Sequence, residues 1–540
     1  MVAALVRLLH SGVQDTSRLL PKDGPKDCSA FLRVWVRGGR FTTQWSRLDF
    51  QQKPNFGTTA FCQLVKKGEL LTRLYLVCNL PDIYSQQAAA IASAGVGFRG
   101  PRFGWTNSLG HALVASITLD IGGVRVETIE SRLLEIHDEY DTPIEKLVNR
   151  NTMIGRIDNG FGETSLGNSV VPQRVIVPLP FWFSKGDLGA ALPIDAIHVD
   201  EIRVGVTFRP VNGVYYTDSR APATAVVAST EGSALWPILG SKFYQADPIN
   251  GTVVPGLALN KQENASLVSP IAGVTMPLTL ALGDTYLLAE YMYLDRPEAN
   301  MFRQAEIELP VVQHYRIEPK DTRGFADVTI PLELPQPTRH LYFMAQNYFS
   351  IPYNAYFLAT RDLSGSDLGY YSGGVPIAAP ASETYAPWWP DCSGLNAAYV
   401  LPLVPGFSTR GSEPFATLEL LYEGNYVKTS TAFPALYRSI LPSLEERKSP
   451  FINRYMYCIP LGVQAGYFPP SVPTGQTNMN RIMKKSLRFG IAGGQGVQEI
   501  SQVVAEDIKT ARQRLWIYCY AETHNILRIY GGRAAMLFAY

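Results

Sequence analysis

Apolar and polar residues alternate from Ile117 onward, and this alternation then gives way to a helical pattern. Because side chains alternate along a strand, one face carries three apolar residues: Ile117, Leu119 and Ile121. Gly122-Gly123 tolerates the positive φ angles of a two-residue turn, and Val124 and Val126 begin the return strand. Apolar residues then recur at the spacing of one helical stripe: Ile129, Leu133, Ile136 and Tyr140. The segment is predicted to be a hairpin followed by a short covering helix.

The same hairpin pattern occurs again, as "LELLYEGNYVKT" around Gly424, followed by "AFPALYRSIL". Three further blocks also occur twice. "LTRLYLVCNL" resembles "PTRHLYFMAQN", "EIRVGVTF" resembles "SLRFGIAG", and "LLAEYMYLD" resembles "LWIYCYAE". The four blocks keep one order in both halves, with loops of different length between them. This repetition favours a duplicated β-domain over a regular solenoid, which would keep a constant period.

The chain is predicted to be all-β, with two tandem eight-stranded jelly-roll β-sandwiches, short helices and long loop insertions. A polar stretch, "DRPEANMFRQAEIELP", interrupts the strands and predicts a short helical linker. We therefore expect an N-terminal arm at 1–25, a first domain at 26–295, a linker at 296–310 and a second domain at 311–540.

Three long stretches do not fit a compact sandwich: Gln86–Gly104, Asn212–Leu282 and Arg361–Phe415. Their length and their Gly and Pro content predict loops on an outer surface. Asn250 and Asn264 begin glycosylation sequons within the second stretch, which fits an exposed surface. "PWWP" at 387–390 suggests either packing of the third stretch or stacking on a sugar, and packing is the favoured interpretation.

The composition restricts the classes of partner. Net charge is +1, from 48 basic and 47 acidic residues, so the totals show no basic excess for coating nucleic acid. The six cysteines are scattered, with no CxxC pair and no zinc spacing: Cys28, Cys62, Cys78, Cys392, Cys458 and Cys519. This usage indicates reduced cysteines and assembly in the cytosol. No apolar run reaches the ~18 residues of a membrane span.

Two motifs resemble chemical sites without the required context. "GVGFRG" (Gly95 to Gly100) matches GxGxxG, but no strand–turn–helix unit surrounds it. Acidic residues and one histidine cluster on the predicted helix: Glu130, Glu135, His137, Asp138, Glu139 and Asp141. A solvated helix face is the interpretation we favour for this cluster. We therefore expect no catalytic, cofactor-binding or metal-binding residues and no enzymatic activity.

The first residues, "MVAALVRLLHSGVQD", offer no clear signal-peptide cleavage site. They predict an amphipathic arm with four apolar residues on one side: Val2, Leu5, Leu8 and Leu9. A frayed terminus without a function is the alternative.

The ordered motifs resemble the double jelly-roll major capsid proteins of large eukaryotic nucleocytoplasmic DNA viruses. "SGVQDTSRLL" and "FLRVWVRGGRFTTQWSRLDF" resemble the family's N-terminal segment and first strands, and "LDIGGVRVE" resembles its "LEIGGQRID" hairpin. "VKKGELLTRLYLVCNLP" is similar to its entry into the fourth strand, with Glu69 where Asp is usual. "VIVPLPFWFSKGDLGAALPIDAIHVDEIRVGV" and "YMYLDRPEANMFRQ" resemble its central segment and interdomain helix. "SVPTGQTNMNRIMKKSLRF" resembles the family's "QPSGxxNFSRIDNxxL" motif, with Met479 and Met483 in place of Phe and Asp. "NILRIYGGRAAMLFAY" resembles the family's C-terminus.

This resemblance implies a structural subunit. Three chains would form a pseudo-hexagonal homotrimer, the capsomer, that tiles an icosahedral capsid within the virion after assembly in the host cytoplasm. Implied partners are further copies of the chain, minor capsid and penton proteins, and an internal membrane surface as the alternative partner of the arm, with no specific nucleic-acid binding. Two other functions stay open: a transient double jelly-roll scaffold of virion assembly, and a two-sandwich glycan-binding protein or enzyme.

Overall fold

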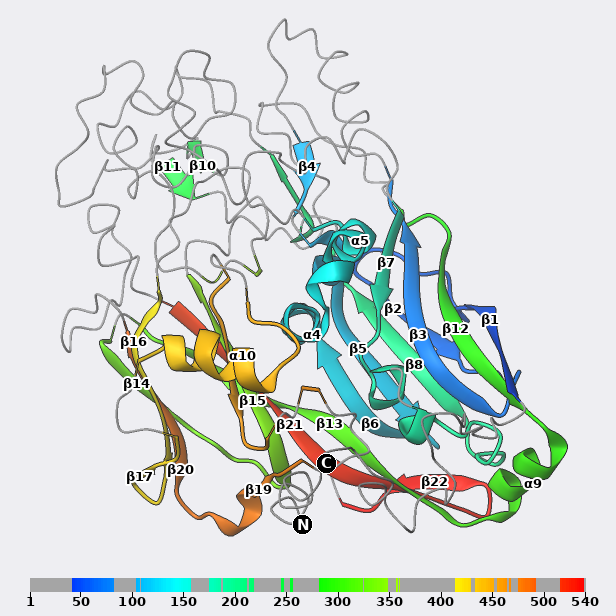
Figure 1. The fold of residues 1–540 in the computed structure, drawn as a ribbon. Helices are drawn as coiled ribbons and strands as arrows, with labels where there is room; N and C mark the ends of the chain where they lie inside the picture. Colours follow the sequence, from blue (N-terminus) through cyan, green and yellow to red (C-terminus); the bar gives the residue numbers. More distant parts are fainter. Residues whose placement is uncertain are drawn as a thin grey trace, which may run out of the picture. The chain divides into compact units, whose positions relative to one another are not determined.

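In the computed structural model, eight of the strands up to Leu294 form two four-stranded antiparallel sheets (Figure 1). We call this part the first half. One sheet has the strand order β1 (Phe41–Asp49), β12 (Thr285–Leu294), β3 (Leu70–Asn79), β7 (Arg174–Pro178). The other has the order β2 (Thr59–Gln63), β8 (Ile202–Phe208), β5 (Val114–Ile121), β6 (Val124–Glu130).

The strands from Ile307 onward form a second pair of sheets, which we call the second half. One has the order β13 (Ile307–Asp321), β21 (Leu515–Tyr530), β15 (Pro337–Asn347), β18 (Met456–Pro460), with β19 (Thr477–Asn478) on β15 and β22 (Arg533–Met536) on β21. The other has the order β14 (Asp327–Pro331), β20 (Lys485–Ile491), β16 (Phe415–Tyr422), β17 (Asn425–Tyr426).

The two halves have the same topology. Each half has eight main strands, if the short strands β19 and β22 and the small ribbons are left out. Numbered along the chain, these eight lie in the order first, eighth, third and sixth in one sheet, and second, seventh, fourth and fifth in the other. This arrangement of eight strands in two sheets is a jelly roll. Every repeated sequence block occupies matching positions: β3 and β15, β5–β6 and β16–β17, β8 and β20, β12 and β21. The predicted fold, a double jelly roll, is confirmed.

The structure describes these residues: 41–81, 103–106, 108–156, 174–185, 188–210, 213–217, 244–246, 253–255, 281–323, 325–347, 356–357, 359, 413–428, 433–450, 454–463, 466–467, 474–491 and 515–538. By its internal contacts the chain divides into Met1–Thr42 and Thr43–Tyr540, and the contacts discussed below all lie within the second unit.

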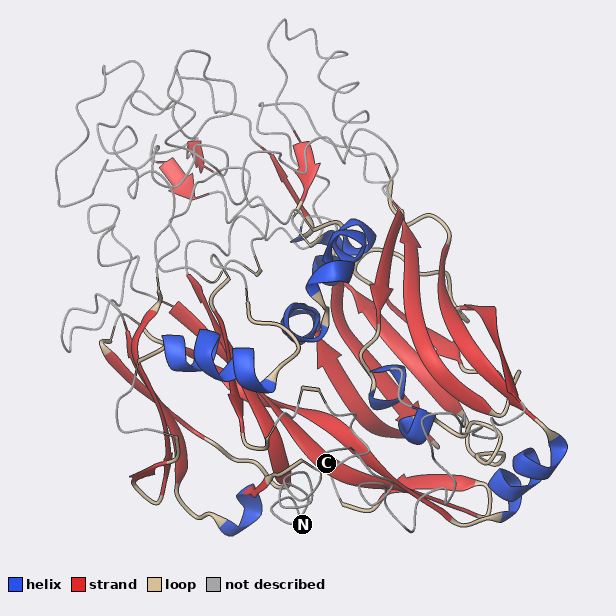
Figure 2. Cartoon of the chain, in the orientation of Figure 1, coloured by secondary structure: helices blue, strands red, loops and turns tan. Residues whose placement is uncertain are grey.

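Short helices connect the strands (Figure 2). They are α3 (Leu109–Leu113), α4 (Ser131–Asp141), α5 (Ile144–Ile154), α9 (Arg296–Gln304), α10 (Leu441–Glu445), the 3₁₀ turns η3 (Trp182–Lys185), η4 (Leu188–Ala190) and η13 (Met479–Arg481), and the π-helical turn η12 (Leu436–Ile440). Two small ribbons pair β4 (Phe103–Trp105) with β9 (Tyr215–Thr217) and β10 (Tyr244–Ala246) with β11 (Val253–Pro255). Among the described residues, no helix has the length and apolarity needed to cross a bilayer.

The predicted hairpin is present. Ile121 pairs with Val124, and the turn residues Gly122 and Gly123 have φ angles of 59° and 83°. Both angles lie in the left-handed region that glycine tolerates best. One detail of the prediction was wrong: Ile129 belongs to β6, and α4 begins only at Ser131.

Apolar residues of the hairpin and of two repeated blocks are buried, each at most 2% exposed: Leu74, Leu76, Ile117, Leu119, Ile121, Ile202 and Val204. They belong to a core cluster that also includes the second half's inner residues, among them Phe343, Phe415 and Phe489. Of the six cysteines, the four in the described ranges are buried free thiols: Cys62, Cys78, Cys458 and Cys519. Several predicted features lie outside the described residues. They are the amphipathic arm, both sequons, "PWWP", Cys28, Cys392 and most of the three long stretches.

Leu119→Ala is expected to lower the free energy of unfolding by about 2–5 kcal/mol, because it leaves a cavity between tightly packed strands. Urea or thermal unfolding of the purified protein measures this loss. Val124, in the same hairpin, is 68% exposed. The control Val124→Ala should therefore cost about 0.5 kcal/mol or less. Equal effects of the two substitutions would show that Leu119 does not face the core.

Candidate functional site

Helix α4 carries a charged face that is buried, although the sequence favoured a solvated one. Four of its polar residues are at most 6% exposed: Glu135, His137, Asp138 and Glu139. The apolar stripe of the helix packs into the core through Leu133, Ile136 and Tyr140. The opposite face meets charged side chains of both halves in place of water. Glu130 and Asp141, at the ends of the cluster, are only partly buried.

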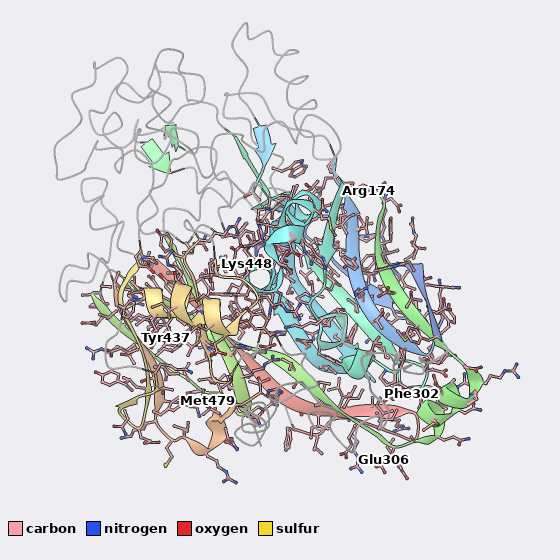
Figure 3. The ribbon with its side chains drawn as sticks, viewed as in Figure 1. Arg174, Phe302, Glu306, Tyr437, Lys448 and Met479 are labelled. Atoms are coloured by element: carbon pink, nitrogen blue, oxygen red, sulfur yellow. The ribbon has the colours of Figure 1, made fainter. Side chains whose placement is uncertain are left out.

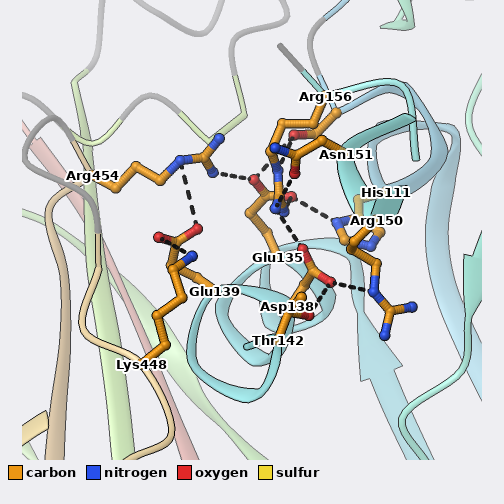
Figure 4. A network of polar contacts seen from close by, with 11 residues as sticks. His111, Glu135, Asp138, Glu139, Thr142, Arg150, Asn151, Arg156, Lys448 and Arg454 are labelled. Atoms are coloured by element: carbon orange, nitrogen blue, oxygen red, sulfur yellow. Dashed lines mark hydrogen bonds and ion pairs between the residues drawn. The ribbon is translucent and has the colours of Figure 1, made fainter. Parts of the chain in front are cut away.

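Glu135 lies at the centre of this face and is fully buried (Figure 4). Its carboxylate pairs with Arg156 at 2.7 Å and with Arg454, from the second half, at 2.6 Å. It also contacts His111 Nδ1 at 2.6 Å and accepts a hydrogen bond from Ser108 Oγ at 3.0 Å. Burial alone would raise the pKa of Glu135, but Arg156 and the other donors hold that pKa well below its ordinary value.

Asp138 extends the network toward α5. Its carboxylate pairs with Arg156 at 2.5 Å and with Arg150 at 3.1 Å, and it accepts a hydrogen bond from Thr142 Oγ1 at 2.9 Å. Burial opposes ionisation of Asp138, yet Arg156 lowers its pKa below the ordinary value. Arg156 therefore has two buried carboxylates as partners, and Arg150 and Arg454 supply the further positive charge that these carboxylates need.

Glu139 connects α4 directly to the second half. It pairs with Lys448 at 3.0 Å, and both side chains are at most 2% exposed. Arg454 lies 3.6 Å from the same carboxylate. Figure 3 labels Lys448 beside the ribbon of the first half. Because both Lys448 and Arg454 come from the chain around α10 and β18, the two halves share one set of ion pairs.

A second group of buried polar residues surrounds His137. His137 Nε2 lies 2.8 Å from His314 Nε2, and His314 Nδ1 contacts Glu127. Gln313 donates a hydrogen bond to the carbonyl oxygen of Val126 at 2.6 Å. Burial, reinforced by the nearby Lys185, lowers the pKa of His137 to about 4. His137 is therefore neutral at pH 7 and joins α4 and β13 without adding a buried charge.

A third group lies on the sheet of the second half that faces α4. His340 Nδ1 contacts Glu522 at 2.5 Å, and His340 Nε2 lies 3.0 Å from Glu446. Cys458 Sγ lies 3.5 Å from the same Glu446 oxygen. Lys185, from the first half, pairs with Glu522 at 3.3 Å. Burial opposes ionisation of Glu522, but Lys185 and His340 hold its pKa well below the ordinary value.

A cavity of about 700 Å³ lies at this junction, lined by residues of both halves that include Asp141, Lys185, His340 and Glu446. The charged groups around it are largely paired with one another, so the arrangement stabilises the junction of the two halves. No short motif marked these residues. Arg454, the ion-pair partner of Glu135, lies 319 positions away, and the only signal was the unusual charge of a helix next to a hairpin.

Comparisons with known proteins agree with this architecture. A family model described as "Major capsid protein N-terminus" matches residues 29–235. The major capsid protein of Rana tigrina ranavirus is 20% identical, over 89% of this chain and 86% of its own length. "Probable capsid protein 4" of Acanthamoeba polyphaga mimivirus is 24% identical over 40% of this chain, and the major capsid protein of Pyramimonas orientalis virus is 26% identical over 38%. These two matches span only 39% and 47% of the relatives' own lengths.

Solved structures show the same fold. A chain of the PBCV-1 virus capsid has a TM-score of 0.61 and 17% identity, covering 95% of this chain and all of its own. The Faustovirus major capsid protein has a TM-score of 0.60 and 10% identity, covering 97% and 96%. Sequence and fold together confirm the resemblance inferred above: the chain is similar to the double jelly-roll major capsid proteins of large eukaryotic DNA viruses.

Proposed function

We propose that the chain is a coat subunit whose homotrimers are pseudo-hexagonal capsomers tiling an icosahedral capsid. The observation that carries the proposal is the presence of two jelly rolls of one topology joined through buried ion pairs. Three such chains around an axis present six similar lobes, which is the symmetry needed to tile a flat facet. The lobes would be 26–295 and 311–540, joined by the linker 296–310 that contains α9 and the start of β13.

The remaining parts of the proposal follow from the same role. The subunit would reside in the virion after assembly in the host cytoplasm, with the three long stretches on the outer face. Neighbouring capsomers, minor capsid proteins and penton proteins would be its partners. Its contribution is binding through repeated interfaces, without catalysis. Presence of the protein in purified mature particles would distinguish a coat subunit from a scaffold that is removed.

Light scattering of the purified protein tests the oligomer. We expect a stable species of about 179 kDa, three times the chain mass of 59.7 kDa. Permanent capsid interfaces should keep this species intact on dilution to low micromolar concentration. A monomer under all conditions, including the ionic strength of particle assembly, would contradict the capsomer proposal.

The buried ion pairs should be required for a stable subunit. Glu135→Gln removes the shared carboxylate and leaves Arg156 and Arg454 without it. Breaking a buried pair by deleting one partner typically costs about 3–5 kcal/mol, so the unfolding midpoint should fall accordingly. The matched control is Glu306→Gln, which breaks the exposed pair with Arg528 and should leave the midpoint unchanged. Similar effects of both variants would show that the network does not stabilise the subunit.

The N-terminal arm is proposed to dock beneath the capsomer, through Val2, Leu5, Leu8 and Leu9. A helix of about ten residues is marginal alone in water, so the arm should become ordered only against a partner. One short stripe binds a membrane weakly, so a minor capsid protein is the favoured partner over the internal membrane surface. Deleting residues 1–12 should leave trimers intact by light scattering but reduce their incorporation into particles. Normal particle yield from the deletion variant would leave the arm without an assembly role.

A further inference from the structure

Three side chains that commonly bind metal ions converge within the second half. They are an imidazole, a carboxylate and a thiol: His340, Glu446 and Cys458. One ligand atom of each lies within 4.8 Å of the other two, and all three residues are buried. None of them takes part in the pairs that join α4 to Arg454 and Lys448, so the α4 network does not account for their convergence.

The sheet places these groups through its register. On β15, His340 and Tyr342 lie on one face, two residues apart, and Cys458 on β18 is the cross-strand partner of Tyr342. His340 is in turn the partner of Glu522 on β21. Glu446 enters from the end of α10, where it is the first residue beyond the helix. The inner face of the same sheet is apolar, so the three groups meet on the face turned toward the first half.

The Glu446–Cys458 distance matches that expected in a tetrahedral zinc site, and the His340–Glu446 distance is about 0.3 Å shorter. Ligand atoms about 2.0–2.3 Å from a tetrahedral zinc ion lie about 3.3–3.7 Å from one another. Here Nε2 of His340 lies 3.0 Å from Glu446 Oε1, and the same oxygen lies 3.5 Å from Cys458 Sγ. The His340 nitrogen has no hydrogen-bond partner of acceptable geometry among the described residues, although an ion pair with Glu446 is close. This nitrogen is therefore available as a ligand.

Neighbouring residues hold two of the ligands in place. Glu522 contacts His340 Nδ1 at 2.5 Å, which leaves Nε2 as the nitrogen available to a metal. A carboxylate on the far nitrogen of a histidine is the usual outer partner of a metal-bound imidazole. Gly466 packs against Glu446, since a Cβ at this glycine would lie 2.2 Å from Glu446 Oε2. Both ligands are thus positioned before an ion arrives.

We propose that His340, Glu446 and Cys458 bind a divalent transition-metal ion, with zinc the ion that best fits this ligand set. Thiolate, imidazole and carboxylate are the ligands zinc takes in proteins, and one thiolate with one carboxylate balances its double charge. His340 and Glu446 line the 700 Å³ cavity, which gives an entry path and a fourth position for water. The bound ion would join α10 to β15 and β18.

A proton is the competing occupant of the same space. An imidazolium at His340 between Glu446 and Glu522 would satisfy the two carboxylates without a metal, and Cys458 would then be a buried thiol. The two arrangements differ in one property that can be measured directly, because only the metal-bound arrangement contains a metal–thiolate bond.

Cobalt(II) titration distinguishes the metal-bound arrangement from the protonated one. The full-length protein is first stripped of metal and kept reduced. We expect one cobalt ion per chain, with the intense visible bands of a four-coordinate ion and a near-ultraviolet thiolate-to-cobalt band. Zinc should displace cobalt stoichiometrically and raise the melting temperature. Absence of the thiolate band from the wild-type protein overturns the proposal without recourse to any variant.

Two cysteine variants test which thiolate binds the metal ion. Cys458→Ser should abolish the thiolate band and weaken cobalt binding more than about 100-fold, since loss of a ligand exceeds the effect of losing an outer partner. Cys519→Ser is the matched control. Cys519 is buried in β21 of the same sheet, where it pairs with Phe343 on the inner face. The control should retain the band, whereas a band that survives in Cys458→Ser would place the metal elsewhere and overturn the assignment.

Discussion

The neutralisation of buried charge on α4 is the constraint on which the rest of the structure depends. A carboxylate removed from water must find a cation, because an unpaired buried charge costs several kcal/mol. Glu135 and Glu139 find theirs in Arg454 and Lys448, which belong to the other half of the chain. The first half therefore reaches full stability only when the second is folded against it. These shared ion pairs join the two jelly rolls into one compact unit.

In the second half, the sheet that contains β15 and β21 is buried on both faces. On β15, Phe343 points inward and stacks on Tyr457, with 5.2 Å between ring centroids, whereas Tyr342 points toward α4 and packs against Tyr140. Successive residues of one strand thus serve two interiors, one apolar and one polar. Over the repeated block "LWIYCYAE", other parts of the chain largely cover both faces of β21, so neither face is fully exposed to water. The block is for this reason nearly continuous in apolar and aromatic residues.

The sequence contained enough local information to predict the fold but not the junction. Strand alternation, the Gly122-Gly123 turn and the four repeated blocks each depend on neighbouring residues, and all of them lead to the observed topology. The charged face of α4 was misjudged because an amphipathic helix has the same pattern whether its polar face meets water or opposite charges. Only the tertiary structure brings Arg454 to Glu135. For the same reason, no spacing rule could reveal that His340 and Cys458, 118 positions apart (458 − 340), lie together.

The duplicated helical segments show how the two copies diverged. In each half a helical segment follows the hairpin: α4 after β6, and η12 with α10 after β17. The two segments meet at the junction, where Glu139 of α4 pairs with Lys448, three residues beyond α10. Two identical copies would bring like charges together at such a contact, which low-dielectric surroundings make costly. At this junction the first half contributes the carboxylates of Glu135 and Glu139, whereas the second half contributes the cations Arg454 and Lys448. The two copies thus differ in charge where these residues meet.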